Sequence, residues 1–216
     1  MTNYNSKEEA VNPKNILEKV CTSPKQAFQF IDNYKYNKHV ILLLILSGIV
    51  KALDKAETKS MGDNISIWGI IGFSLFIGLL FGWLLNYIYA FLVSKTGEYL
   101  NGKASTESIL RVLAYSLIPA VISLFVYFVR ILFYGNSIFQ STILYSSDEL
   151  LNNIISYIFI FIDLFLMVWS LILLVIGISI VQKFSIGKAI VNIVLPAILI
   201  VLIFLILYVV IDLIAH

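Results

Sequence analysis

The sequence predicts an all-α, polytopic integral membrane protein, a bundle of five transmembrane helices preceded by a cytoplasmic amphipathic segment. The chain is 60% hydrophobic and 13% charged, whereas a soluble domain averages about 25% charged residues. No formal charge occurs from Ile65 to Ser94 or from Ala189 to Ile211, and Asp163 is the single charge between Leu150 and Gln182. These runs exceed the ~20 apolar residues that cross a ~30 Å hydrocarbon core.

Residues 1–37 are expected to form the cytoplasmic segment, because they are polar and lack the apolar core of a cleavable signal peptide. The first 13 residues have the composition of a disordered tail. A hydroxyl and a proline at residues 22–24 predict a helix start, and the helix is expected to reach Tyr36. Its apolar residues share one face: Ala27, Phe28, Ile31 and Tyr34. This face lies either on the membrane surface or on the protein's own loops.

Residues 38–216 are expected to form the membrane domain. Backbone groups in lipid must be hydrogen-bonded within their own segment, so the apolar runs are helices. The spans are expected at about 39–53, 65–94, 108–134, 153–182 and 189–213. The first is short for a bilayer, although snorkelling by Lys51 would extend its reach. A re-entrant first segment is the alternative.

The placement of lysine and arginine predicts a cytoplasmic N-terminus and an external C-terminus. With five spans in this orientation, eleven of the fifteen basic residues lie on the cytoplasmic side. The four on the other side are Lys51, Lys55, Lys59 and Arg130.

Small residues at four-residue spacing mark the second span. Ser74, Gly78 and Gly82 share one helix face with Asn86. Such a stripe lets a second helix approach closely. The stripe is either an internal packing seam or an interface for self-association.

Asp163 is the most unusual residue of the spans, because it falls about ten residues into the fourth. An intramembrane carboxylate costs ~2.5–3.5 kcal/mol on insertion scales and therefore faces the interior of a bundle. Together with Asn86, Tyr115 and the helix break at Pro119, it makes a candidate intramembrane polar site. The site either binds a proton or cation, or holds helices together through a protonated acid.

Arg130 and Asp212 fall near the external ends of the third and fifth spans. Each lies 21 to 24 residues beyond its cytoplasmic loop, about 32–36 Å along a helix. Similar depth predicts an ion pair if the two helices are neighbours. Separate snorkelling of the two side chains to the headgroups is the alternative.

Signatures of enzymes and metal sites are missing from the sequence. The histidines are His39 and His216, so there is no His-Glu-x-x-His motif, and the sequence also has no Gly-x-Ser-x-Gly elbow and no Walker A loop. A single cysteine, Cys21, excludes an internal disulfide. We therefore expect no enzymatic activity, no cofactor and no metal. The net charge of +2 does not indicate a nucleic-acid partner.

Two predicted cytoplasmic turns have similar sequences, Gly102-Lys103-Ala104 and Gly187-Lys188-Ala189. Each glycine is expected to end a helix and turn the chain. Pro119 and Pro196 follow in the next spans and are expected to interrupt them. The likeness reflects either a parallel internal repeat or chance in a low-complexity membrane sequence.

At these residues the chain resembles the Yip family of Ypt/Rab-interacting integral membrane proteins. The segment Tyr115–Pro119 is similar to the family's Gly-Tyr-x-x-x-Pro element, and Leu100–Ala104 precedes it. Three further segments look like bacterial members: Thr22–Phe28, Ile176-Gly177 and Gly187–Ala189. Ala114 stands where the family has glycine, and the Asp-Leu-Tyr-Gly-Pro element of eukaryotic members is missing.

The resemblance implies a five-span fold with a cytoplasmic N-terminus, in a bacterial plasma membrane. Eukaryotic members are linked to Rab GTPases and vesicle traffic, but a Rab-binding role is not implied without their N-terminal element. The implied function is that of a non-enzymatic membrane adaptor or membrane-organising factor of trafficking type. Its expected partners are membrane lipids, other membrane proteins or a second copy of the chain. The alternative is a small ion or proton channel or transporter that uses Asp163.

Overall fold

The computed structural model describes residues 13–142 and 147–215, and every regular element within them is a helix. In chain order these elements are η1 (Pro13–Asn15), α1 (Ile16–Thr22), α2 (Pro24–Asn33), α3 (Val40–Thr58), η2 (Met61–Asp63), α4 (Ile67–Tyr99), α5 (Thr106–Ser116), α6 (Ile118–Tyr134), η3 (Gly135–Phe139), α7 (Glu149–Gln182) and α8 (Ile186–Ala215).

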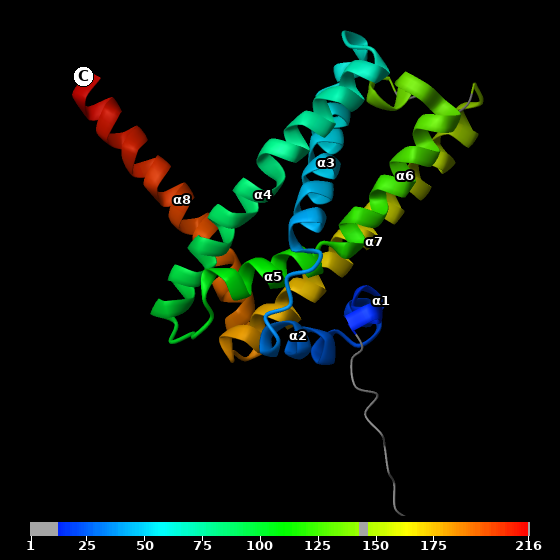
Figure 1. Cartoon of the computed structure of the whole chain (residues 1–216). Coiled ribbons are helices and arrows are strands. Elements are labelled where there is room, and N and C mark those ends of the chain that lie inside the picture. Colours follow the sequence, from blue (N-terminus) through cyan, green and yellow to red (C-terminus); the bar gives the residue numbers. More distant parts are fainter. Residues whose placement is uncertain (1–12, 143–146, 216) are drawn as a thin grey trace, which may run out of the picture.

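Three arms rise from one base (Figure 1). The base, which we call the platform, consists of α1, α2 and α5. The arms are α3 with α4, α6 with α7, and α8. At the opposite end η2 and η3 form a cap that joins the first two arms, where Asn136 Nδ2 donates to the Gly62 carbonyl at 2.8 Å. The arms therefore meet at the platform, and two of them meet again at the cap.

Four of the described helical segments are long and apolar enough to cross a membrane: 67–99, 106–139, 149–182 and 186–206. Helix α3 is not among them, because four charged residues fall within its last eight positions. Its 19 residues nevertheless extend about 28 Å at 1.5 Å per residue. A crossing by α3, and with it a count of five spans, stays a prediction.

Helix α3 packs on α4 through glycine. A Cβ atom on Gly48 of α3 would lie 2.5 Å from the Gly82 Cα atom, and a Cβ atom on Gly82 would lie 2.6 Å from the Leu44 carbonyl oxygen. Gly78 faces Ile49 of α3, and Ser74 is fully buried. The small-residue stripe of α4 thus forms a seam inside the chain, where the two backbones approach closely.

The expected third span, 108–134, is not one straight helix. The helix breaks at Leu117, so that α5 lies across the platform and α6 rises from it (Figure 1). Pro119 stands in the first turn of α6, where proline is tolerated, whereas inside a continuous helix its ring would clash with the carbonyl of Tyr115 four residues earlier.

Pro196, in contrast, does not interrupt its span, and the expectation that it would was wrong. Helix α8 continues through it from Ile186 to Ala215. The Tyr89 hydroxyl of α4 donates to the Ile193 carbonyl at 2.8 Å, one turn before the proline. The carbonyl that loses its donor to the proline is that of Asn192, four residues earlier, so the Tyr89 bond holds α8 to α4 beside this position and does not replace the missing bond.

The two turns also differ from the expected glycine turns. Asn101 and Lys183, with φ of 63° and 58°, adopt the left-handed conformation. The next residue closes each turn: the Gly102 N–H donates to the Gly97 carbonyl, and the Phe184 N–H donates to the Ser179 carbonyl. Gly187 lies inside α8. Both turns are therefore Schellman-type helix ends, formed one and four residues earlier in the chain than the glycines suggested.

The apolar face of α2 packs against the protein and not against lipid. Ala27, Phe28 and Ile31 are buried, and Gly177 of α7 makes room for Phe28. Tyr34, expected on the same face, is 72% exposed. The amphipathic pattern of this segment thus reflects a seat on α5 and α7.

Two separate hydrophobic clusters result. The larger joins the platform to the adjoining ends of the arms and includes Phe28, Tyr115 and Leu173. The smaller lies at the cap and includes Tyr127 and Phe139, whose rings stack with centroids 6.3 Å apart. The candidate site adjoins both clusters, since Leu117, packed on the larger cluster, and Tyr127 of the smaller one both line it.

Candidate functional site

A cavity of about 600 Å³ lies between α3, α6 and α7. Its polar lining residues come from all three helices: Ser47, Lys51, Asp54, Glu57, Thr58, Ser123, Tyr127, Asp163 and Ser170. Leu117, Leu166 and Met167 contribute apolar surface. A mixed-charge cavity is unusual in a chain of such hydrophobicity, because ionisable groups in a membrane are costly and normally serve a function.

Helix α3 supplies a polar face to this cavity. Ser47, Lys51, Asp54 and Thr58 follow the i, i+4, i+7, i+11 spacing of one helix face. The seam with α4 occupies an adjoining face, with Gly48 at its centre. Close packing on one side of α3 therefore turns its charged residues towards α6 and α7.

Arg130 of α6 anchors the charges. Its side chain is almost fully buried, and its guanidinium contacts both carboxylate oxygens of Glu57, at 2.6 and 3.1 Å. The guanidinium also lies 5.3 Å from the centre of the Tyr127 ring and 5.1 Å from that of Phe159. A bidentate pair of this kind fixes orientation as well as energy.

Tyr127 connects the acids of α3. Its hydroxyl oxygen lies 2.8 Å from Asp54 Oδ1 and 2.7 Å from Glu57 Oε2. A phenol has a single O–H to donate, so the two carboxylates compete for one donor. The cluster therefore has more acceptor oxygens than this phenol can satisfy.

Asp163 of α7 is the acid least constrained by the cluster. Its carboxylate lies 3.9 Å from Arg130 Nη1, and 42% of its side chain is exposed, against 23% for Glu57. Asp163 also belongs to the lining of the cavity. Two carboxyl groups, those of Asp54 and Asp163, thus line the hollow in addition to the Glu57 group that Arg130 holds.

The residues of the predicted polar site do not form one site. Asp163 shares its cavity with Ser123, while Asn86 lines a different hollow, between α3 and α4. Tyr115 is fully buried in the platform cluster. Pro119 stands in the first turn of α6, next to Ala120, which lines the cavity. Their separation was not predictable from the sequence, because it depends on how the helices pack, and each residue lies on a different face or at a different depth.

Arg130 meets Glu57 and Asp163, where the sequence offered Asp212 as its partner. Asp212 lies in the last turn of α8, and that arm diverges from α6 and α7 (Figure 1). Similar depth along two helices does not report the lateral distance between them, and that distance keeps a pair from being predicted by depth alone.

Lys51, Asp54 and Glu57 were missed as site residues. Their regular spacing is visible in the sequence, but for the short first span only Lys51 was given a role, that of a residue that snorkels. The i, i+3 and i, i+4 spacing of charges within a mainly apolar helix was the available signal.

A second polar cluster lies at the platform end and is neutral. Gln182 Oε1 accepts from the Ala104 N–H at 2.9 Å, and Gln182 Nε2 lies 3.3 Å from Asn192 Oδ1. Asn192 Nδ2 in turn donates to the Val93 carbonyl at 3.0 Å and to Thr96 Oγ1 at 2.9 Å. This amide network ties α4, α7 and α8 together with both amides buried.

Comparison with known proteins agrees with this architecture of apolar helices. The family model of the Yip1 domain matches residues 19–208, which includes every membrane-spanning candidate. Among the curated proteins and the solved structures, no match was found. Because the match covers most of the sequence, the chain belongs to the Yip1 domain family of membrane proteins.

Proposed function

We propose that this Yip1-domain protein is a non-enzymatic membrane-organising factor or adaptor of trafficking type, and that its main partners are membrane lipids. The supporting observation is the divergence of its arms (Figure 1). A closed bundle would cover its apolar faces with other helices of the chain. Here large apolar side chains on all three arms are exposed, among them Phe76, Phe125 and Phe204, and the membrane can cover them.

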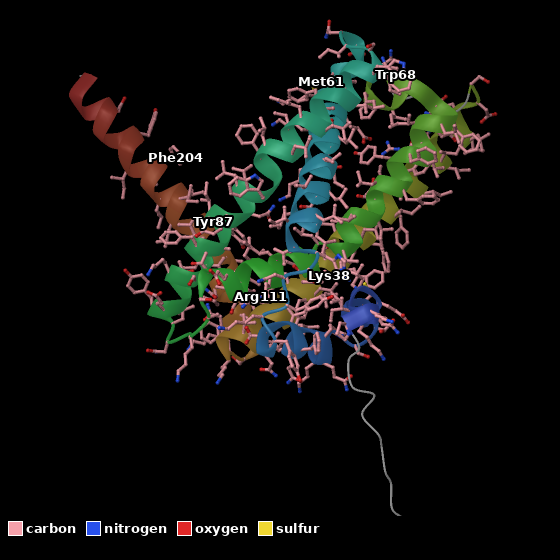
Figure 2. The ribbon with its side chains drawn as sticks, in the orientation of Figure 1. Lys38, Met61, Trp68, Tyr87, Arg111 and Phe204 are labelled. Atoms are coloured by element: carbon pink, nitrogen blue, oxygen red, sulfur yellow. The ribbon has the colours of Figure 1, made fainter. Side chains whose placement is uncertain are left out.

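Helix α8 illustrates the open faces. It contacts α4 and α7 close to its start, through Asn192 and Ile193. Further along, Phe204 projects from the arm (Figure 2) and is 68% exposed. Trp68, near the cap, is 79% exposed, at a position that suits an interfacial aromatic residue.

A groove of about 420 Å³ separates α7 from α8. All of its lining residues are branched aliphatic: Leu171, Ile172, Val175, Ile176, Ile186, Ile190, Ile193 and Val194. Close packing of two transmembrane helices uses small residues, and this lining has none. Acyl chains therefore fit the groove better than a partner helix does.

Photo-crosslinking in native membranes tests this function. A crosslinking residue at Ile190, in the groove, is compared with one at Phe204, on the same helix but on the open arm. We expect the lipid adducts of Ile190 to be enriched in particular lipids, while those of Phe204 follow the bulk composition. Identical bulk lipid profiles at both sites, with no protein adduct at either, would contradict an organising role.

The second candidate function is an ion or proton path through the cavity that Asp163 lines. Its support is that three acids, Asp54, Glu57 and Asp163, line one cavity of an apolar helical protein, because ionisable residues among membrane helices often mark ion pathways. Against it stand the apolar residues of the platform cluster, such as Tyr115 and Leu173, between the cavity and the other end of the bundle. In liposomes with a pH or potassium gradient we expect no flux. Flux that Asp163→Asn abolishes would establish the path instead.

A further inference from the structure

We infer that the hollows on either side of Lys51 form a binding site for one zwitterionic phospholipid, with its headgroup in the mixed-charge cavity and an acyl chain in an apolar hollow beside it. The inference rests on the proposed function and names the lipid class. The supporting observation is that an apolar hollow and the mixed-charge cavity both have Lys51 in their lining.

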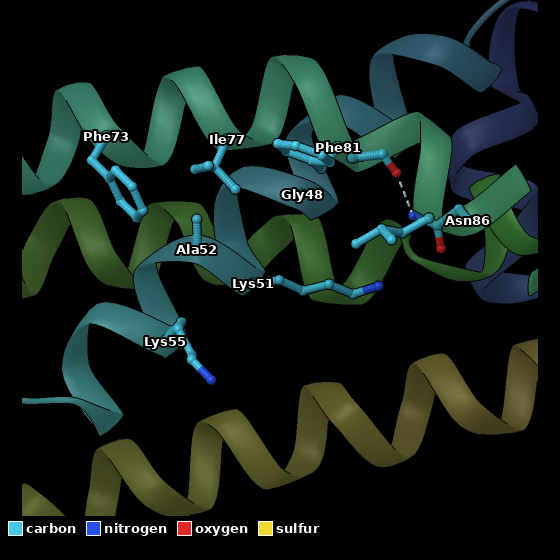
Figure 3. Close-up of a pocket in the computed structure, with 10 residues that line it drawn as sticks. Gly48, Lys51, Ala52, Lys55, Phe73, Ile77, Phe81 and Asn86 are labelled. Atoms are coloured by element: carbon cyan, nitrogen blue, oxygen red, sulfur yellow. Dashed lines mark hydrogen bonds between the residues drawn. The ribbon is translucent and has the colours of Figure 1, made fainter. Parts of the chain in front are cut away.

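The apolar hollow lies between α3 and α4 and measures about 270 Å³ (Figure 3). Its wall is formed by Phe73, Ile77 and Phe81 of α4, and Ala52 of α3 faces them. The lining is overwhelmingly apolar, so it suits a hydrocarbon chain.

Lys51 belongs to the lining of both hollows. Lys55, one turn nearer to the cap, lines the apolar hollow as well. In Figure 3 Lys55 points away from the aromatic wall, while Lys51 extends alongside α4 towards the end of the hollow where Asn86 lies. An amphiphile has the same sequence of properties, from apolar chain to phosphate to amine. A phosphate at Lys51 would lie at the junction of the two hollows.

The charges of the cavity then suit the remainder of the headgroup. Asp54 and Asp163 face the cavity, while Glu57 is held by Arg130. A headgroup ammonium would meet two carboxylates, and its phosphate would meet Lys51. A purely anionic headgroup would instead bring further negative charge to the acids, which costs free energy at low dielectric.

The position of the cavity along α3 suits a headgroup. The cavity reaches Thr58, the last residue of the helix. Asp54 is four residues before this end, about 6 Å along the axis, so a headgroup at Asp54 stays near the membrane surface at the cap. The 600 Å³ volume falls within the ~300–1,000 Å³ of typical small-ligand sites.

Lipid retention by the full-length protein tests the inference. The wild-type chain is released from nanodiscs that contain equal amounts of phosphatidylethanolamine, phosphatidylglycerol and diacylglycerol, and bound lipid is counted by native mass spectrometry. We expect one phosphatidylethanolamine retained about tenfold over either competitor, as for about 1.4 kcal/mol of selectivity. Equal retention of the three, or preference for phosphatidylglycerol, would overturn the inference without any variant.

Variants then assign the roles. We expect Lys51→Gln to lose the retained lipid about tenfold, because it removes the phosphate partner. Asp163→Asn removes an ammonium partner, so the preference is expected to move towards phosphatidylglycerol. Lys59→Gln, an exposed lysine outside both hollows, is the matched control. Retention unchanged in both site variants would overturn the site. The crosslinking at Ile190 probes the distant α7–α8 groove, so either test can fail without the other.

Discussion

The two polar clusters of this protein lie at opposite ends of the arms and differ in kind. At the platform, Gln182 and Asn192 form a neutral network whose groups bond to one another and to backbone, with almost no exposure. Towards the cap, Arg130, Glu57 and Asp163 are charged and line a large cavity. The amides of the first cluster are buried and hydrogen-bonded to one another and to backbone, whereas the charged groups of the second cluster line a cavity.

The difference separates holding a fold from offering a site. A fully partnered network of amides specifies the contact of three helices and has nothing left for a ligand. A cluster with more carboxylates than the nearby phenol and guanidinium can satisfy gains from an added cationic group. Substitutions in the platform network should therefore lower the free energy of unfolding. Substitutions at the cavity should lower either the free energy of unfolding or the affinity for a ligand, depending on the residue.

The largest effect is expected from Arg130→Met. This change leaves Glu57, Asp54 and Asp163 without their buried cation and should destabilise the protein by about 3–5 kcal/mol. Thermal unfolding in one fixed detergent, followed by circular dichroism, measures it. The double variant Arg130→Met/Glu57→Leu should recover part of the loss, because it removes the uncompensated charge as well. Wild-type stability in Arg130→Met would show that the guanidinium is not the anchor of the cluster.

The amide network should show the next largest effect. Asn192→Ala leaves the Val93 carbonyl, Thr96 and Gln182 short of partners, and we expect a loss of about 1–3 kcal/mol. Asn153→Ala on the exposed start of α7 is the control and should change stability by less than about 0.5 kcal/mol. Equal unfolding temperatures for the two variants would contradict a structural role of the network.

Two glycines of α4 should respond with opposite sign to the same substitution. A Cβ atom on Gly97 would overlap Gln182 Nε2, whereas one on Gly72 would meet nothing within 4 Å. Gly72→Ala should gain up to about 1 kcal/mol from helix propensity. Gly97→Ala should lose about 1 kcal/mol net, because overpacking at about 1–3 kcal/mol exceeds that gain. The same sign of shift for both in thermal unfolding would show that the network has room to yield.

The smallest effect on stability is expected from Asp163→Asn. Its carboxylate is 3.9 Å from Arg130 Nη1 and its side chain is 42% exposed, so the change should cost about 0.5 kcal/mol or less. The lipid preference described above should nevertheless change. A stability loss as large as that of Arg130→Met would assign Asp163 to the anchor and not to the binding surface.

The helices themselves were largely predictable. The apolar runs located α4, α7 and α8 to within a few residues, because the cost of leaving backbone unpaired in lipid forces such runs to be helical. Pro119 marked a real break. Pro196 did not: α8 continues through it while packed on α4, whose Tyr89 hydroxyl donates to the Ile193 carbonyl, and local sequence contains no information on that neighbour.

The candidate site was only partly predictable. Asp163 was recognisable as an acid within an apolar run, but its companions were not. Lys51, Asp54 and Glu57 are more than a hundred residues away in sequence from Asp163, and they meet it only because the glycine seam turns their face of α3 towards α6 and α7. Likewise, the amphipathic pattern of α2 was compatible with lipid or with protein as its partner.

By itself, the sequence determined that this chain has the apolar helices of a membrane protein and that one acid, Asp163, interrupts an apolar run. Hydropathy reports the transfer free energy of each segment, which depends on that segment alone. The tertiary structure decided which face of α3 packs, which carboxylates Arg130 meets, and which polar cluster is closed. Those outcomes depend on the close approach of distant segments, and no local pattern records that approach.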